Sequence, residues 1–277
     1  MPNKTRTRTH HNTKSKAPER EIFIELERVS VARGLKTILH DVSLRMQADE
    51  HLVILGPNGC GKSTLIKTLT CECYPLAHPE TRVRIFGRER WELSELRKRL
   101  GIVEGDLPRE RTLQSQGRDA VLSGFFASST IWPGMEISRE MRERADEVLG
   151  HLEAQQLAEK PVGEMSAGEM RRILIGRALV HNPRVLLIDE PSNALDLAAQ
   201  HELRQTLRKL ARHGTGILLV THHLADIPPE IERVVMLREG KVFADGPKEK
   251  LLTKGRLEKL FGVPLTVTRR DGYYHVW

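Results

Sequence analysis

The sequence predicts an α/β protein in which helices cover a buried parallel sheet, with an antiparallel β subdomain near the start. Three observations carry this prediction. In the second half of the chain, short apolar runs with the length of buried strands alternate with helical patterns. Residues 21–46 alternate apolar and polar side chains, as an antiparallel sheet with one solvated face does. The 277 residues suffice for one large domain with a small appendage.

The composition is typical of a soluble globular protein, with 39% hydrophobic and 29% charged residues. No apolar run approaches the roughly 20 residues that span a bilayer. A role in transport across a membrane would therefore need another chain to form the channel. Cys60, Cys71 and Cys73 are odd in number and lack a second ligand pair at zinc spacing, which favours a reducing compartment over a metal site.

The net charge of +7 is concentrated at the start of the chain. Residues 1–20 hold six Lys or Arg and one acid, Glu19, so they carry +5 and the rest of the chain carries the remaining +2. The segment has no apolar periodicity, which predicts a disordered basic tail. It also lacks the apolar core of a secretory signal. A solvated extension is favoured, and an arm that contacts nucleic acid or anionic lipid stays open.

The helices and strands follow in order. Residues 51–55 form a continuous apolar run before Gly-Pro-Asn-Gly, which predicts a buried strand that feeds a loop. Residues 82–86 alternate as a strand does, and 91–100 have helical spacing. Residues 108–165 are richest in helical pattern and predict a helical subdomain. The later elements are a helix from Ala167, a strand at 185–188, a helix near 197–212 and a strand at 217–220.

The chain ends in two β-prone runs separated by Asp271-Gly272, which is a hairpin signal. Residues 263–277 are therefore predicted to form a small β-hairpin appendage. The main domain then extends over residues 21–262.

A glycine-rich loop gives the strongest functional signal. Gly-Pro-Asn-Gly-Cys-Gly-Lys-Ser-Thr fits the phosphate-loop pattern (P-loop, Walker A) G-x-x-x-x-G-K-[ST], between a predicted strand and a predicted helix. Its three glycines permit backbone angles that aim N–H groups inward, and the helix N-terminus adds partial positive charge. We expect Lys62 to contact the β- and γ-phosphates and Ser63 to bind Mg²⁺. The predicted nucleotide-binding residues are Gly56, Pro57, Asn58, Gly59, Cys60, Gly61, Lys62, Ser63 and Thr64.

Two carboxylates, Asp189 and Glu190, end the buried strand that begins at Val185. Acids at the end of such a strand need a cation, unless the strand simply reaches water. With a phosphate loop upstream, we predict that Asp189 binds Mg²⁺ directly or through water. Glu190 is predicted to polarise the attacking water. The two motifs together predict a P-loop nucleoside triphosphatase with a RecA-like parallel core sheet.

The order of five motifs resembles the ATP-binding cassette (ABC) ATPases over residues 22–262. Met-Ser-Ala-Gly-Glu at 165–169 resembles the family signature Leu-Ser-Gly-Gly-Gln. Ser-Asn-Ala-Leu-Asp at 192–196 resembles the D-loop, and His222 resembles the switch histidine. The resemblance implies ATP and Mg²⁺ as ligands, and an ABC-type α-helical subdomain at about 108–165.

The resemblance also implies a homodimer in which two copies sandwich ATP head to tail. Ser166 and the Gly168 amide would bind the γ-phosphate held by the other copy. His222 would sense that phosphate and orient the catalytic Glu190. Ser166-x-x-Glu169 at a helix start is in addition a capping box, and both interpretations can hold.

Three departures from the family pattern bear on turnover and on nucleotide preference. Met165, Ala167 and Glu169 replace Leu, Gly and Gln in the signature; the latter two changes can slow hydrolysis, although Glu169 can instead cap its helix. Gly105 aligns with the Q-loop glutamine, which is therefore missing. The aromatic residue that stacks on adenine is absent too, and Arg33 offers a guanidinium in its place.

The whole chain resembles ATPase subunits of molybdenum-type and iron-chelate-type bacterial importers. Ser-Gly-Phe-Phe at 123–126, the run 222–228 and the segment from Gly262 support this. The resemblance implies a transport-coupled ATPase in the cytoplasm, peripheral on the inner face of the cell membrane, that drives a separate transmembrane permease. The aromatic pair Phe125-Phe126 is either core or a patch that faces such a partner.

Two other functions stay open. A soluble ABC ATPase that acts on nucleic acid or ribosomes through the basic tail (photorepair-like) is less favoured, because that class usually carries two cassettes in one chain. The altered signature also allows a nucleotide-gated structural module with little turnover.

Overall fold

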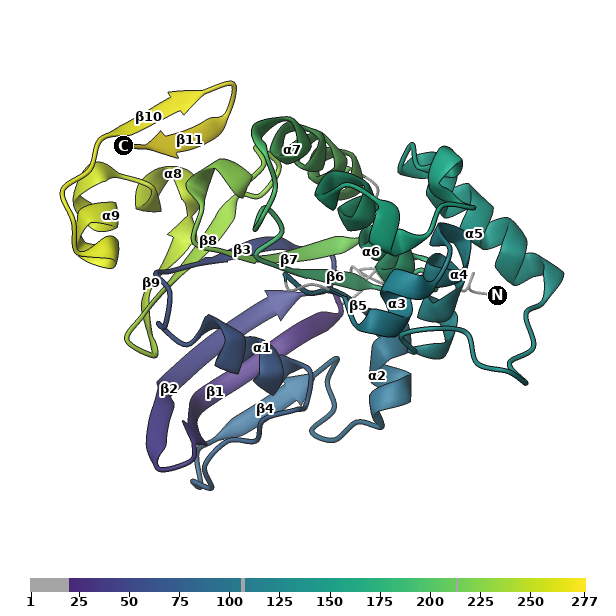
Figure 1. Cartoon of the computed structure of the whole chain (residues 1–277). Helices are drawn as coiled ribbons and strands as arrows, with labels where there is room; N and C mark the ends of the chain where they lie inside the picture. Colours follow the sequence, from purple (N-terminus) through teal and green to yellow (C-terminus); the bar gives the residue numbers. More distant parts are fainter. Residues whose placement is uncertain (1–19, 106–107, 213) are drawn as a thin grey trace, which may run out of the picture.

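The structure is a computed structural model that describes residues 20–105, 108–212 and 214–277. Of the predicted basic tail only Arg20 lies among them, so that prediction falls outside the described residues. Figure 1 shows one sheet across the middle of the molecule, a second sheet below it, helices gathered at one end and a hairpin at the other. This arrangement confirms the predicted fold class.

The central sheet has six strands in the order β5-β6-β7-β3-β8-β9. All neighbours run parallel except β8 and β9. The inner strands β6, β7, β3 and β8 are almost wholly apolar and buried because helices and the second sheet cover both faces. The strands are β3 (His51–Leu55), β5 (Leu100–Val103), β6 (Val185–Asp189), β7 (Gly216–Thr221), β8 (Arg233–Arg238) and β9 (Lys241–Pro247).

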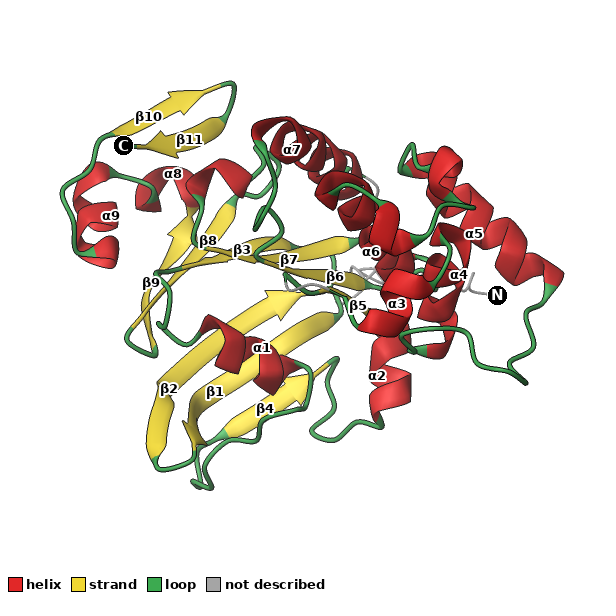
Figure 2. Ribbon diagram, viewed as in Figure 1, coloured by secondary structure: helices red, strands yellow, loops and turns green. Residues whose placement is uncertain are grey.

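The second sheet is antiparallel, in the order β2-β1-β4, as the alternation of residues 21–46 predicts. Its strands are β1 (Ile22–Arg33), β2 (Lys36–Gln47) and β4 (Arg82–Ile85). Helix α1 (Lys62–Leu69) lies between the two sheets, and its Leu65 and Leu69 share a buried cluster with Ile54 and Val29. Figure 2 shows α1 against the antiparallel layer. The cluster fixes the phosphate loop between both sheets.

Helices fill the region between β4 and β6. Val121 and Leu122 are buried, and the partly buried Phe125 packs against the same core, which favours the core interpretation for Phe125. The elements here are α2 (Leu93–Arg99), α3 (Glu110–Gln114), α4 (Gly117–Leu122), η1 (Ser123–Phe126), α5 (Arg139–His151), η2 (Gln155–Leu157), η3 (Val162–Glu164) and α6 (Ala167–Leu179).

The chain closes with a hairpin of β10 (Val267–Arg270) and β11 (Tyr273–Val276). Asp271 and Gly272 both have positive φ, as a two-residue hairpin turn of type I′ requires. Strand β11 packs against η4 (Leu224–Asp226), the short helix that follows β7. The remaining helices are α7 (Leu197–Ala211), α8 (Lys248–Leu251) and α9 (Lys254–Phe261).

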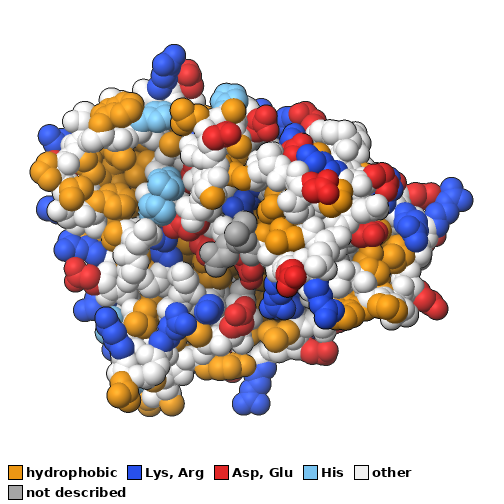
Figure 3. All heavy atoms as spheres, viewed as in Figure 1, with side chains coloured by type: hydrophobic (Ala, Val, Ile, Leu, Met, Phe, Trp, Pro, Cys, Tyr) orange, Lys and Arg blue, Asp and Glu red, His pale blue; other side chains and the backbone are white. Residues whose placement is uncertain are grey.

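The surface in Figure 3 mixes both signs of charge, while hydrophobic side chains gather at the upper left, toward the C-terminal elements. The mixture agrees with the small net charge outside the tail. None of the helices in the described part of the chain has the length and apolar character needed to cross a membrane.

Candidate functional site

The phosphate loop connects β3 to α1 at the carboxyl edge of the central sheet. Gly59 and Gly61 have φ of +77° and +110°, the left-handed region that glycine adopts without strain. Gly61 is the N-cap of α1. Lys62, the first residue of the helix, is 7% exposed, and its Nζ donates to the Gly56 carbonyl at 2.8 Å and to the Pro57 carbonyl at 3.2 Å. The lysine is therefore held back against its own loop.

Gly56 is needed for a reason different from the predicted one. Its φ is not positive; instead, a Cβ at this position would lie 2.3 Å from the Leu237 carbonyl oxygen and 2.7 Å from Cys60 Sγ. The loop thus passes directly against β8. The expectation that all three glycines serve unusual backbone angles is wrong for Gly56.

Glu190 contacts its predicted partner His222 at this edge, and also Lys62, which is predicted to bind phosphate. Its Oε1 lies 3.2 Å from Lys62 Nζ, and its Oε2 lies 2.7 Å from His222 Nδ1. The carboxylate side chain is only 13% exposed. Glu190 also has φ +42°, an uncommon angle for a residue with a side chain, which turns the chain sharply after β6. Lys62, Glu190 and His222 are far apart in the sequence. The parallel strands β3, β6 and β7, which precede them, bring them together at one edge of the sheet.

The pKa of the Glu190 carboxyl lies below its usual range. Burial pushes that pKa up, but the hydrogen bond with His222 and the charge of Lys62 outweigh burial. Glu190 is therefore a carboxylate at neutral pH. A buried carboxylate that accepts a hydrogen bond from an imidazole is suited to take a proton from water.

Asp189 ends β6 beside Val220 of β7. The backbone of Gly105 packs directly on this turn, because a Cβ at position 105 would lie 2.8 Å from the Asp189 carbonyl oxygen and 3.2 Å from Glu190 Cβ. A glutamine at position 105 would require the turn to shift. Glycine at the Q-loop position is thus matched to the packing here.

Arg171 ties the signature helix to the same loop. Its guanidinium donates to the carbonyls of Glu104 at 2.7 Å and of Gly105 at 3.2 Å, and the side chain is 7% exposed. Burial lowers the pKa of Arg171. Sequence reasoning missed this contact, which spans more than 60 positions and has no local signal.

A second missed residue is Asp226, which is 2% exposed in η4. Its Oδ2 accepts from Ser192 Oγ at 2.6 Å and from Thr221 Oγ1 at 3.0 Å. Burial raises the pKa of Asp226, and the two hydroxyl donors offset part of that rise. The contacts join the D-loop-like segment to the end of β7.

The signature residues begin α6. Ser166 is its N-cap, and Ser166 Oγ accepts from the Glu169 amide at 3.2 Å while Glu169 Oε2 accepts from the Ser166 amide at 2.8 Å. The predicted capping box is therefore confirmed. Lys160 Nζ lies 2.9 Å from Glu169 Oε2, and this hydrogen bond lowers the pKa of Glu169. The Glu169 carboxylate is thus bound by the amide at the start of its own helix and by Lys160.

The structure does not bring every predicted residue to the phosphate loop. Ser166 is exposed, and a Cβ at Gly168 would lie 2.9 Å from Ala199 Cβ, so Gly168 lets α6 and α7 approach. Within the described ranges, no hydrogen bond or ion pair joins Ser166 or Gly168 to the loop. Arg33 is exposed at the end of β1, at the turn into β2.

Two side chains, those of Ser63 and Asp189, are predicted to bind magnesium. Among the residues described, no three His, Cys, Asp or Glu side chains gather as a metal cluster. Ser63 is exposed in the first turn of α1 and Asp189 is half-buried at the end of β6. A hydroxyl and a carboxylate are hard oxygen donors, and Mg²⁺ commonly takes only one or two protein ligands while phosphates and water complete its shell. The donor set fits Mg²⁺.

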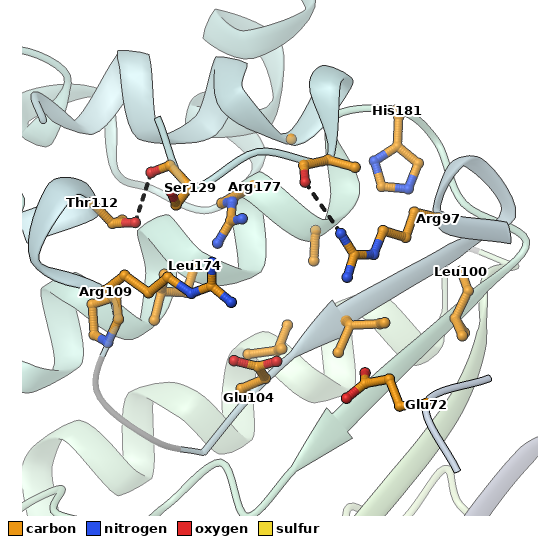
Figure 4. Close-up of a pocket in the computed structure, with 16 residues that line it drawn as sticks. Glu72, Arg97, Leu100, Glu104, Arg109, Thr112, Ser129, Leu174, Arg177 and His181 are labelled. Atoms are coloured by element: carbon orange, nitrogen blue, oxygen red, sulfur yellow. Dashed lines mark hydrogen bonds between the residues drawn. The ribbon is translucent and has the colours of Figure 1, made fainter. Parts of the chain in front are cut away.

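A basic pocket lies beside the Q-loop segment (Figure 4). Its cavity of about 190 Å³ is lined by Arg97, Arg109 and Arg177, with Glu104 and His181 at its edges. Arg177 lies largely buried, and burial and the two other arginines lower its pKa. The pocket therefore concentrates positive charge at the junction of the sheet and the helical region.

The comparisons with known proteins agree with this geometry. A family model described as ABC transporter matches residues 39–193. An uncharacterized ABC transporter ATP-binding protein, YlmA of Bacillus subtilis (strain 168), is 32% identical over 251 residues, which cover 89% of this chain and 93% of the relative. The hemin import ATP-binding protein HmuV of Aliivibrio fischeri is 33% identical over 250 residues, or 87% of this chain and 91% of the relative.

One solved structure is similar in both sequence and fold. The dimeric structure of MJ0796, described as a bacterial ABC transporter cassette, has 28% identity and a TM-score of 0.63, and the match covers 81% of this chain and 98% of that one. The phosphate loop, the paired acids and the capped signature helix thus occur on a fold that the relatives share. The chain belongs to the ABC transporter family, as one of its ATP-binding, ATP-hydrolysing subunits.

Proposed function

We propose that two copies of this chain bind ATP and Mg²⁺ head to tail, and that hydrolysis drives a separate membrane permease of an importer. One observation carries the proposal. Lys62, Glu190 and His222 converge within one copy, whereas Ser166 and Gly168 stay apart from them. The site is therefore half built within a single chain. MJ0796, a similar cassette, is solved as a dimer, which supports the missing half coming from a second copy.

Lys62 is the residue that exchanges partners when nucleotide binds. Its Nζ now contacts two loop carbonyls and Glu190. The β- and γ-phosphates offer it stronger, fully charged acceptors. Moving Lys62 to the phosphates also removes one stabilising charge from Glu190, which raises the basicity of that carboxylate at the stage when a base is needed.

Glu190 acts as the general base and His222 as its orienting partner. The 2.7 Å contact between His222 Nδ1 and Glu190 Oε2 fixes the direction of the carboxylate. The other nitrogen of the same imidazole is proposed to sense the γ-phosphate. Gly56, Pro57, Asn58, Gly59, Cys60, Gly61 and Thr64 form the remaining phosphate cradle.

Ser63 and Asp189 would hold Mg²⁺. When bound, the ion neutralises charge that develops on the phosphates. Ser63 supplies its hydroxyl at the helix start, and Asp189 supplies a carboxylate at the strand end. Arg33 is proposed to stack on the base, from an exposed position that leaves its guanidinium face available.

Ser166 and the Gly168 amide are proposed to bind the γ-phosphate held by the second copy. Ser166 Oγ accepts from the Glu169 amide, and its hydrogen, which the Glu169 carboxylate takes in the single chain, would be donated to the γ-phosphate. The N-terminus of α6 adds partial positive charge toward the phosphate. Glu169 opposes this only weakly because Lys160 and the Ser166 amide bind its carboxylate.

The permease would dock at the basic pocket with an acidic segment. Arg97, Arg109 and Arg177 provide guanidinium groups there, and Arg109 makes no ion pair with any described residue. Carboxylates pair with guanidinium bidentately. Since a similar relative is named for hemin import, an iron-chelate-type importer is the proposed class, with the chain on the inner face of the cell membrane.

The proposed organisation follows the same division. Residues 21–262 form the ATPase domain, with its helical subdomain at about 108–165, and 263–277 form the hairpin appendage. The alternative of a nucleic-acid or ribosome partner gains no support from the reported relatives, whose names state only transport roles.

Purification from native membranes tests this function. We expect the chain to fractionate with membranes and to bring down one permease, and Arg109→Glu to weaken that association. Lys67→Glu, in the last turn of α1, changes the charge by the same amount and serves as the matched control. Wholly soluble fractionation with no permease bound would refute the transport role, and loss of salt-sensitive RNA binding on deletion of residues 1–20 would favour the alternative.

A further inference from the structure

Thr221, at the end of β7, is shared between two carboxylates. Its Oγ1 lies 3.0 Å from Asp226 Oδ2 and 3.3 Å from Glu190 Oε2. The His223 amide donates to the same oxygen at 3.0 Å. A threonine hydroxyl has a single hydrogen, so it can donate to only one of the two acids. Which acid receives that hydrogen affects the proposed catalytic base directly.

The geometry favours Asp226 as the acceptor. Its distance to Thr221 Oγ1 is the shorter of the two. Asp226 is 2% exposed, and among the described residues Ser192 is its one other side-chain hydrogen-bond donor. Glu190 already accepts from the imidazole of His222 and lies near Lys62. A buried carboxylate gains more from each donor than one with other donors.

We propose that Asp226 is a positioning residue that binds the Thr221 hydroxyl hydrogen and so keeps it away from the Glu190 carboxylate. This inference rests on the proposed role of Glu190 as base. A hydrogen bond from Thr221 to Glu190 Oε2 would occupy a lone pair that the carboxylate uses to accept a proton from water. In this role Asp226 contacts neither the nucleotide nor the attacking water. It lies in η4, directly after the end of β7 and the predicted switch histidine His222.

Asp226→Asn reverses the direction of this hydrogen bond while it preserves shape. Ser192 and Thr221 share Asp226 Oδ2, so the Asn amide nitrogen in that place donates to both hydroxyl oxygens. The Thr221 hydrogen is thereby released to Glu190. The added hydrogen bond occupies a lone pair of Glu190 Oε2, the oxygen that already accepts from His222, so the carboxylate takes a proton from water less readily and kcat falls by up to about tenfold. The Kd for ATP stays within twofold, since no phosphate contact changes.

The second substitution, Thr221→Val, removes the released hydrogen. We expect Asp226→Asn with Thr221→Val to turn over several times faster than Asp226→Asn alone. A purely structural role predicts the opposite, because a second loss from the same buried network adds damage. Thr221→Val alone should lower kcat by less than the Asp226→Asn change does. Ser123→Ala, which removes another buried hydroxyl remote from Glu190, is the control for buried hydroxyl loss.

The decisive measurement is kcat and ATP Kd for the parent, both single variants and the double variant. Rescue of kcat by Thr221→Val supports the proposal. Any of three results overturns the proposal. The first is a double variant whose kcat is equal to or lower than that of Asp226→Asn. The second is a parental kcat in Asp226→Asn, and the third is a loss of kcat in Thr221→Val alone as large as that in Asp226→Asn. Should Asp226→Asn fail to fold, Asp226→Leu with and without Thr221→Val gives the same comparison with apolar packing.

Glu190→Gln separates this inference from the proposed function. If Glu190→Gln loses turnover and no rescue occurs, only the role of Asp226 fails. If Glu190→Gln keeps full turnover, the base assignment itself fails and the inference goes with it.

Discussion

The phosphate-loop side and the signature side of this molecule are built in opposite ways. At the first, Lys62 is buried, and the half-buried Glu190 contacts both Lys62 and His222. At the second, Ser166 heads an exposed helix start whose polar groups bond only within their own turn and to Lys160. The first is a closed cluster, and the second is a helix start with no contact to the phosphate loop among the residues described. This difference is what the proposed sharing of the site between two copies would explain.

The largest expected effect comes from the chemical step on the closed side. Glu190→Gln removes the base but keeps the shape, so we expect kcat to fall by about 10²–10⁴-fold while ATP still binds. Steady-state turnover and a separate nucleotide-binding assay check both parts. Glu95→Gln, at an exposed helix position, should leave turnover unchanged. Parental turnover in Glu190→Gln would contradict the base assignment.

Removal of the lysine tests the same side through binding. Lys62→Ala removes the ammonium group that is proposed to leave Glu190 and bind the phosphates. We therefore expect the affinity for ATP to drop by about hundredfold. Equilibrium binding of ATP with Mg²⁺ measures this. Lys67→Ala, in the last turn of the same helix, should bind as the parent does. Equal affinity in Lys62→Ala would remove the basis of the phosphate-loop assignment.

Acid should destabilise the fold near the C-terminal end of α6, opposite the end that Ser166 caps. His181 follows α6, burial lowers its pKa to about 4, and no described group bonds to either ring nitrogen. The unfolded chain binds this proton near pH 6.5, so the native state loses stability as pH falls from about 7 through 4. With partial exposure taken into account, the expected loss is about 1–2 kcal/mol.

His181→Leu should abolish that part of the pH dependence. Denaturant unfolding at pH 7 and pH 5 gives the difference in the free energy of unfolding for both proteins. His151→Leu, at an exposed helix end, is the control. An identical pH dependence in the parent and in His181→Leu would show that His181 is not responsible.

The smallest expected effect concerns the altered signature. Glu169→Gln keeps an acceptor for the Ser166 amide and removes a charge that Lys160 already neutralises. We therefore expect turnover to rise by less than about threefold, since the paired charge contributes little at a distance. A rise of tenfold or more would mean that Glu169 repels the phosphate directly and that the signature is tuned for slow hydrolysis.

Local patterns predicted the parts of this site that local sequence determines. The phosphate loop, the acids after β6 and the capping box each depend on residues within a few positions of one another. Asp226 and Arg171 escaped prediction because their partners lie 34 and 67 positions away, as in the bonds to Ser192 and Glu104. The role of Gly56 was mistaken for the same reason, since its close neighbour Leu237 lies on another strand.

Glycine at position 105 illustrates the remaining gap. The sequence shows only that a glutamine expected by resemblance is missing. The structure adds that Asp189 and Glu190 pack against that backbone too closely for a side chain. Tertiary packing of this kind has no periodicity or spacing that a sequence pattern can reveal.

The central claim is that each site takes its lysine from one copy and its serine from the other. Lys62→Ala and Ser166→Glu, each folded and each inactive alone, should regain activity when mixed, because half of the dimers then carry one intact site of two. The predicted turnover of the equimolar mixture is about a quarter of the parental value. A mixture as inactive as its components would contradict a site shared between copies.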